Sequence, residues 1–167
     1  TVYAACRKCP DLHLLPPHHD EYRRMSRVVN AIYARYTDLV EPFGIDESWL
    51  DMTGSWHFFG KSPAEVADRL RREVKEETGL TISVGVSFNK VFAKLGSDYR
   101  KPDATTVIFA GDVERIVYPL PVEALLYVGK SACCTLRAMG IRTIGEAAKA
   151  DEEALAAALG KAGRQLS

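Results

Sequence analysis

The apolar residues between positions 22 and 36 recur with helical spacing. An α-helix completes a turn every 3.6 residues, so this spacing places them on one face. The pattern therefore predicts an amphipathic helix that packs that face against the rest of the protein. Its apolar positions are Tyr22, Met25, Val28, Val29, Ile32, Tyr33 and Tyr36.

Residues 39–53 predict a β-hairpin with a charged turn. Strand-like runs over 39–45 and 48–53 flank the acidic pair Asp46 and Glu47. Adjacent carboxylates repel each other, and a hairpin turn more often carries Asn-Gly or Asp-Gly. The paired acids therefore indicate a compensating cation, and a divalent metal ion is the first candidate.

The next helix has the clearest boundary signals in the chain. Ser62 supplies an N-cap, and Pro63 suits the first helical position. Glu65 is placed to complete a capping box, and Gly79 supplies a C-terminal stop. The residues expected to face the core are Val66, Ala67, Leu70 and Val74.

Strand and helix patterns alternate after that helix. Residues 80–87 and 105–109 predict strands, and residues 89–95 have a short helical repeat between them. Strands interleaved with helices predict an α+β sandwich, in which an antiparallel or mixed sheet carries its helices on one face.

The chain changes character at Leu120 and becomes all-helical. The pattern predicts helices over 132–139 and 144–150, joined by a turn at Gly140, and alanine-rich helix continues to Leu159. This part is expected to form a small all-α unit.

A glycine-containing loop precedes the first of these helices. Gly129, Lys130 and Ser131 end that loop, and together with the helix pair they look like a helix-hairpin-helix. In that motif, backbone N–H groups at a helix N-terminus bind a phosphate without reading sequence. The loop lacks the upstream glycine of a Walker A motif. The alternative is a helix pair that simply packs.

The overall composition is that of an ordinary globular protein. The chain has 167 residues, of which 47% are hydrophobic, so it can bury a core. Its net charge of +0 and pI near 6.8 exclude a polybasic binder and restrict any nucleic-acid affinity to one region. It has neither a run of about eighteen apolar residues nor a basic-then-apolar leader, so we expect a cytoplasmic protein without a membrane segment.

The N-terminal cysteines favour reduced thiols over a metal site. Cys6 and Cys9 have the spacing of a thioredoxin-like pair or of half a zinc site, but a zinc site needs a second pair of ligands. His13, His18 and His19 are poorly spaced for that role. We therefore expect reduced thiols on packed helices.

Two-metal nucleotidyl transfer offers one use for the acidic pair. It needs carboxylates that hold one ion to activate the attacking oxygen and another to neutralise the leaving phosphates. Mg²⁺ prefers oxygen ligands, and Asp46 and Glu47 provide two such side chains. The alternative is a solvated acidic pair that only caps a turn.

Lysines follow the second predicted strand. Lys90 and Lys94 lie four residues apart and would share one helical face, while Pro102 holds Lys101 in an extended conformation. Such lysines can meet phosphates as compact point charges. The alternative is an ordinary solvated face.

Taken in order, these motifs resemble those of the Y-family translesion DNA polymerases of the bacterial DNA polymerase IV type. The family's acidic motif is Ser-Ile-Asp-Glu followed by an aromatic residue and Leu-Asp-Val-Thr. Its second series combines a glycine, Asn-Lys, Ala-Lys and Ser-Asp-x-x-Lys-Pro, and its thumb carries a helix-hairpin-helix. The similar residues here are Gly44-Ile45-Asp46-Glu47-Ser48-Trp49-Leu50-Asp51-Met52-Thr53, Gly85, Asn89-Lys90, Ala93-Lys94 and Ser97-Asp98-Tyr99-Arg100-Lys101-Pro102.

The resemblance implies a role for each site residue. Asp46 would bridge two catalytic Mg²⁺ ions, and Glu47 would ligate the ion that activates the primer 3′-hydroxyl. Lys101 would contact the triphosphate of the incoming nucleotide. DNA contacts would come from Lys94, Gly129, Lys130 and Ser131.

The resemblance also implies a central fragment of a longer enzyme. Residues 1–18 would be a remnant of the fingers, 19–110 the palm and 111–167 a partial thumb. The family's first palm strand, which carries a third metal-binding carboxylate, and its little finger have no counterpart in this sequence. We expect this chain alone to be inactive. The complete polymerase would act on primer–template DNA and a deoxynucleoside triphosphate, and regions outside this chain would contact the sliding clamp.

Two other functions compete with this one. A non-catalytic DNA-binding module would use the helix-hairpin-helix and leave the acidic turn solvated. A nucleotidyl cyclase has a similar sheet with paired acids, but it has no duplex to hold, so the helix-hairpin-helix argues against it.

Overall fold

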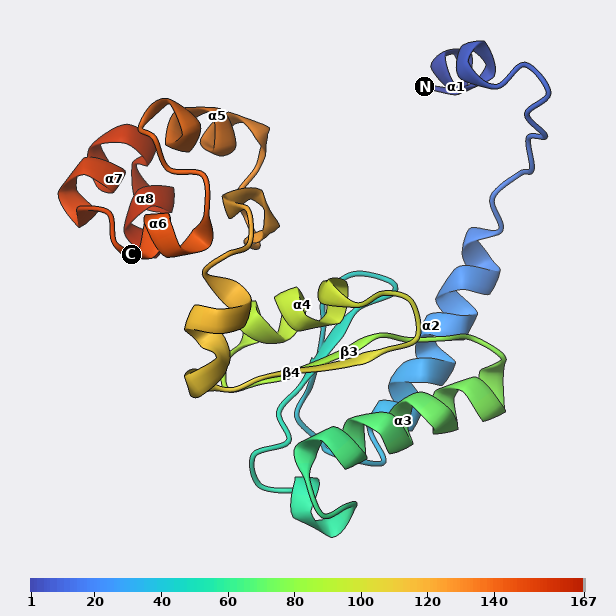
Figure 1. The fold of residues 1–167 in the computed structure, drawn as a ribbon. Helices are drawn as coiled ribbons and strands as arrows, with labels where there is room; N and C mark the ends of the chain where they lie inside the picture. Colours follow the sequence, from blue (N-terminus) through green and yellow to red (C-terminus); the bar gives the residue numbers. More distant parts are fainter. Residues whose placement is uncertain (167) are drawn as a thin grey trace.

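The amphipathic helix predicted near the N-terminus is present as α2 (His19–Tyr33) in the computed structural model, which describes residues 1–166 (Figure 1). Ile32 and Tyr33 at its end are buried, as is Tyr36 in the turn that follows. A shorter helix, α1 (Val2–Lys8), precedes it and contains no buried residue. Figure 1 shows α1 standing apart from the other elements, joined to them by an extended segment.

The predicted hairpin is confirmed, with strands shorter than expected. β1 (Val40–Pro42) pairs antiparallel with β2 (Ser48–Leu50), and Val40 lies opposite Leu50. Beyond the strands, the backbone N–H of Phe43 donates to the carbonyl of Glu47 at 2.8 Å. The turn between these two residues carries the acidic pair.

The second long helix, α3 (Pro63–Thr78), has the caps that its sequence predicts, with one difference. The Ser62 hydroxyl accepts from the N–H of Glu65 at 3.2 Å, and Gly79 ends the helix in the left-handed region at φ 72°. The Glu65 carboxylate, however, accepts from the N–H of Lys61 at 2.8 Å, one residue before the N-cap. Side chains of α2, of the turn after it and of α3 form the first hydrophobic core, against which Val40 and Leu50 of the hairpin pack. Its buried residues are Ile32, Tyr33, Tyr36, Val66, Leu70 and Val74.

A parallel strand pair with a crossing helix forms the centre of the fold. β3 (Val84–Ser87) and β4 (Thr105–Ile108) run parallel, and α4 (Lys90–Tyr99) connects them. β3 begins four residues later than predicted, at Val84, which lies opposite Thr105 at the start of β4. The Asn89 side chain caps α4 by accepting from the N–H of Phe92 at 2.8 Å, and the helix runs four residues beyond its predicted end.

The β3–β4 pair has helices on both faces, which corrects the expectation of helices on one face only. Thr105 hydrogen-bonds with Asp68 of α3, whereas Ile108 is buried with Leu95 of α4. Successive strand residues point to opposite faces, so these contacts place α3 and α4 on opposite sides. Figure 1 shows the same arrangement. Within the described residues, β1–β2 and β3–β4 are two separate two-stranded sheets, and the α+β class is confirmed.

The C-terminal part is helical, as expected. Its core contains Val122 and Leu136, both fully buried, and an isolated bridge joins Pro121 to Thr143. Ser167, the last residue of the predicted thumb, lies outside the described residues. The helices are α5 (Lys130–Ala138), α6 (Ile144–Ala148), α7 (Glu152–Leu159) and α8 (Lys161–Leu166). Elsewhere in the chain, short 3₁₀ helices span Trp56–Phe58, Ala110–Asp112 and Val122–Ala124, and one π-helical turn spans Val113–Val117.

A third apolar cluster connects the two parts of the chain. Leu95 of α4 and Ile108 of β4 are buried together with Val117 and Ile144, which belong to the helical part. Burial of apolar surface at this junction stabilises the contact between them. Across residues 1–166, no helix has both the length and the apolar character that a bilayer crossing requires.

The approach of α4 to β3 requires a glycine at position 85. A Cβ atom added to Gly85 would lie 1.8 Å from the carbonyl oxygen of Ala93 and 2.6 Å from the amide nitrogen of Ser97. One Cβ on Gly96 would lie 3.1 Å from the Cα of Gly85. Helix and strand therefore meet backbone to backbone, and a side chain at position 85 has no space.

We expect Gly85→Ala to lower the free energy of unfolding by about 2 to 3 kcal/mol, because the new methyl group must displace backbone atoms. Urea unfolding followed by circular dichroism measures this change. The control is Gly111→Ala, where no atom lies within 4 Å of the added Cβ and the change should stay within about 0.5 kcal/mol. Equal unfolding midpoints for the two variants would contradict the close approach.

Candidate active site at the acidic turn

The hairpin turn presents the two predicted carboxylates at the surface. Gly44 begins the turn at φ 97°, a conformation that favours glycine. Asp46 is exposed, and Glu47 is half-buried just before β2. The two acids are therefore held by strand pairing on either side.

Lys94 of α4 reaches across to this turn. Its Nζ atom lies 2.8 Å from Oε1 of Glu47 and 2.8 Å from Oδ2 of Asp98. Burial opposes the charged form of Lys94, but the hydrogen bonds to Asp98 and Glu47 outweigh it, so the pKa of Lys94 is raised. The lysine therefore remains charged beside the acidic pair.

Lys101 joins the same chain of charges through Asp98. The Lys101 ammonium lies 2.7 Å from Oδ1 of Asp98, so Asp98 holds a lysine on each carboxylate oxygen. Burial alone would raise the pKa of Asp98, but Lys101 and Lys94 together lower it below its usual value. The structure thus brings three of the predicted site residues, Glu47, Lys94 and Lys101, into one ion-pair chain.

Lys90 makes a second link between α4 and the hairpin. Its ammonium group pairs with Glu41 of β1 and lies over the ring of Trp49, 5.3 Å from the centroid. The indole N–H of Trp49 donates to the carbonyl of Lys90 at 3.2 Å. Both lysines of the predicted helical face therefore contact the hairpin.

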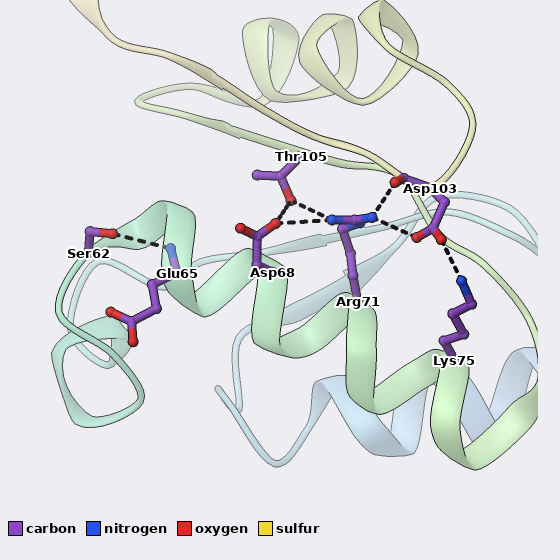
Figure 2. Close-up of polar contacts among 7 residues, drawn as sticks. All are labelled: Ser62, Glu65, Asp68, Arg71, Lys75, Asp103 and Thr105. Atoms are coloured by element: carbon purple, nitrogen blue, oxygen red, sulfur yellow. Dashed lines mark hydrogen bonds and ion pairs between the residues drawn. The ribbon is translucent and has the colours of Figure 1, made fainter.

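The loop that carries Lys101 is fixed from α3 by a network that the sequence motifs did not reveal. Asp103 has a left-handed backbone at φ 49° and accepts from Arg71 at 2.6 Å and from Lys75 at 2.8 Å (Figure 2). Arg71 also reaches Asp68 at 3.0 Å, and Asp68 accepts from the Thr105 hydroxyl at 2.6 Å. The hydrogen bond from Lys75, which has the larger effect, and the hydrogen bond from Arg71 lower the pKa of the Asp103 carboxyl group.

The only advance signal for this network was the helical spacing of its members on α3. Asp68, Arg71 and Lys75 are separated by three and four residues and therefore share one face of that helix. Their partners at positions 103 and 105 come from a distant segment, so the spacing alone could not identify them.

The donor set at the turn fits Mg²⁺ in kind but is incomplete. Carboxylate oxygens are the ligands that Mg²⁺ prefers, and Asp46 and Glu47 supply them. Glu47 already faces Lys94, and within residues 1–166 no group of three or more histidine, cysteine or acidic residues is placed to hold a metal ion.

The expectation that Cys6 and Cys9 lie on packed helices is wrong, because α1 has no buried residue and Cys9 is exposed.

The predicted phosphate-binding loop belongs to the helical part. Gly129 is the N-cap of α5 and, as a glycine, has no side chain to cap the helix. Gly129, Lys130 and Ser131 are all exposed. In the described part of the chain, no hydrogen bond or ion pair links these residues to the acidic turn. The structure therefore does not bring them together with Asp46 and Glu47.

Comparison of the amino-acid sequence with known proteins identifies a family and several relatives. The profile of the impB/mucB/samB family matches residues 1–98. A protein named DNA polymerase IV from Acetivibrio thermocellus is 48% identical over 166 residues, which cover 99% of this chain and 41% of the relative. DNA polymerase IV from Ralstonia nicotianae is 45% identical over 142 residues, covering 85% of this chain and 40% of the relative.

Solved structures have the same fold. DinB from Sulfolobus solfataricus is similar with a TM-score of 0.88 and 25% identity, over 99% of this chain and 49% of that one. An insertion ternary complex of Dbh DNA polymerase has a TM-score of 0.86 at 25% identity, over 99% and 48% of the two chains. This chain spans about two fifths of the length of the curated relatives it matches.

Proposed function

Because this chain belongs to the impB/mucB/samB family, we propose that it supplies the acidic turn of a Y-family DNA-directed DNA polymerase. That enzyme would add deoxynucleotides to a primer 3′-hydroxyl during bypass of DNA damage. The observation that carries the proposal is the ion-pair chain from Glu47 through Lys94 and Asp98 to Lys101, which connects one carboxylate of the acidic pair with a lysine that can meet a phosphate. The relatives named DNA polymerase IV support it.

Asp46 and Glu47 are the residues that would hold two Mg²⁺ ions, whose chemistry at such a site is to activate the primer hydroxyl and to neutralise the triphosphate. Asp46 is exposed on the turn and accessible to a cation. The described residues contain no group of three or more carboxylate, histidine or cysteine side chains placed to hold a metal ion. We therefore expect no primer extension from this chain alone.

Lys101 would bind the triphosphate of the incoming deoxynucleotide. Its side chain is 54% exposed, and the Arg71–Asp103 contact fixes the loop that carries it. A lysine ammonium is a compact charge that can follow phosphate oxygens. Lys94 was expected to contact DNA, but its ammonium is engaged by two carboxylates, so in this proposal it acts at the acidic turn instead.

The backbone at Gly129, Lys130 and Ser131 would bind primer–template DNA. The backbone N–H groups of Lys130 and Ser131 at the start of α5 can donate to a phosphate, and the Lys130 side chain adds a positive charge. In this assignment residues 1–18 belong to the fingers, 19–110 to the palm and 111–167 to the thumb. Contact with a sliding clamp would lie in segments outside this chain.

The acidic pair can be tested in a chimera in which this chain replaces the matching residues of the Acetivibrio thermocellus relative. We expect the chimera to extend a primer, and Asp46→Asn or Glu47→Gln to slow extension about 100-fold or more, because each removes a metal ligand. Glu41→Gln on the same hairpin is the control and should change the rate less than about twofold. Equal rates for all variants would contradict the proposal, and a chimera that binds DNA without extending it would favour the DNA-binding module.

The DNA contact can be tested with this chain itself. We expect Lys130→Ala to weaken binding of a labelled duplex equally for different sequences, and to reduce the slope of log affinity against log salt by about one, because one phosphate contact is lost. Fluorescence anisotropy at several salt concentrations measures both quantities. Lys149→Ala, at the end of α6, is the control. An unchanged slope for Lys130→Ala would exclude the predicted contact.

A further inference from the structure

Lys94 differs from the neighbouring lysines in how its charge is satisfied. Its side chain is 18% exposed, against 57% for Lys90 and 54% for Lys101. A lysine that binds a nucleic-acid phosphate must present its ammonium group to the partner. The Lys94 ammonium instead lies between Glu47 and Asp98, at 2.8 Å from each.

Asp98 anchors this lysine on its own helix. The two residues are four apart on α4, a spacing that favours an ion pair on a helix surface. Glu47, in contrast, comes from the hairpin, 47 residues away in sequence. The ammonium group of Lys94 therefore keeps one carboxylate partner whether or not Glu47 is engaged.

We infer that Lys94, anchored by Asp98, is a positioning residue that serves as the built-in counter-ion of Glu47 and is exchanged for a divalent cation. The inference rests on the proposed function of the acidic turn. Without a cation, Asp46 and Glu47 repel each other, and the charge of Lys94 offsets that repulsion. When a divalent cation takes the Glu47 oxygens, Asp98 retains the ammonium group, so that no half-buried charge is left unpaired.

Two roles for Lys94, exchange with the cation and orientation of Glu47 from outside a metal site, predict opposite effects on cation binding. Lys94 touches Oε1 of Glu47 directly, which is an atom that a metal ion would also use. Exchange therefore predicts that loss of Lys94 tightens cation binding. If Lys94 instead oriented Glu47 from outside a metal site, its loss would weaken binding about 10- to 100-fold. The direction of the change separates the two roles.

The test is a titration of the ¹⁵N-labelled chain with Mn²⁺, following paramagnetic broadening of the amide signals of Asp46 and Glu47. Lys94→Met keeps an unbranched, flexible side chain but removes the charge. We expect the Mn²⁺ concentration that broadens these signals by half to be about three- to tenfold lower, because a competing charge is gone. Lys90→Met is the matched control, since it removes the same charge from the same helix and frees Glu41 on the same hairpin. Its effect should stay below about twofold.

Asp98→Asn tests the anchor through a double-mutant cycle. If Asp98 acts through Lys94, its effect on Mn²⁺ binding should be larger in the unsubstituted chain than in the Lys94→Met background. Unchanged amide signals away from the turn establish that each variant is folded. Equal effects in the two backgrounds would overturn the role of Asp98.

The outcomes separate this inference from the proposed function. If broadening at the turn depends on Asp46 but is unchanged or weaker in Lys94→Met, the exchange is overturned and the metal-binding turn stands. If broadening at the turn is absent, or survives Asp46→Asn, the exchange is overturned, and primer extension by the chimera then decides the proposed function.

Discussion

The backbone contact between β3 and α4 is the constraint on which the candidate site depends. It exists because Gly85 has no side chain, so that the carbonyl of Ala93 can approach the strand. α4 is thereby held directly on the sheet. From this position its lysines reach the hairpin, while Leu95 is buried with Ile108. One close contact therefore supports both the acidic turn and the junction with the helical part.

The charged side chains of this protein form local ion pairs, and the chain has no net excess of either sign of charge. The net charge is +0, yet Glu41 and Glu47 on the hairpin face Lys90 and Lys94 on α4. Ion pairs near the surface each contribute only about 0 to 1 kcal/mol to stability, so these pairs are better understood as setting the position of the side chains. The half-buried pair of Glu47 and Lys94 has the most direct consequence, because Glu47 is a proposed metal ligand.

Local signals predicted the elements that local chemistry determines. Ser62, Pro63 and Gly79 defined the ends of α3 because capping depends on neighbouring residues. The apolar repeat identified α2, and the acidic pair marked the hairpin turn. The order of the motifs also led to the Y-family resemblance, which the family profile and the relatives confirm.

The features that sequence reasoning missed depend on contacts between distant segments. Asp103 meets Arg71 and Lys75 through the tertiary packing of the β3–β4 pair against α3, and no motif links those positions. The placement of α4 opposite α3 follows from which strand residues each helix covers, which periodicity does not reveal. The roles of Asp46, Glu47, Lys101 and the Gly129–Ser131 loop stay predictions, because they concern partners that bind from outside.

The candidate site depends on α4 holding the ammonium group of Lys94 against the carboxylate of Glu47. The most direct measurement is NMR of the ammonium group in the ¹³C,¹⁵N-labelled chain, through scalar coupling across the hydrogen bond from Lys94 Nζ to carboxyl carbons. We expect correlations to both Glu47 and Asp98, with the first lost in Glu47→Gln and the second retained. A freely rotating ammonium group, or a correlation to Asp98 alone in the unsubstituted chain, would contradict it.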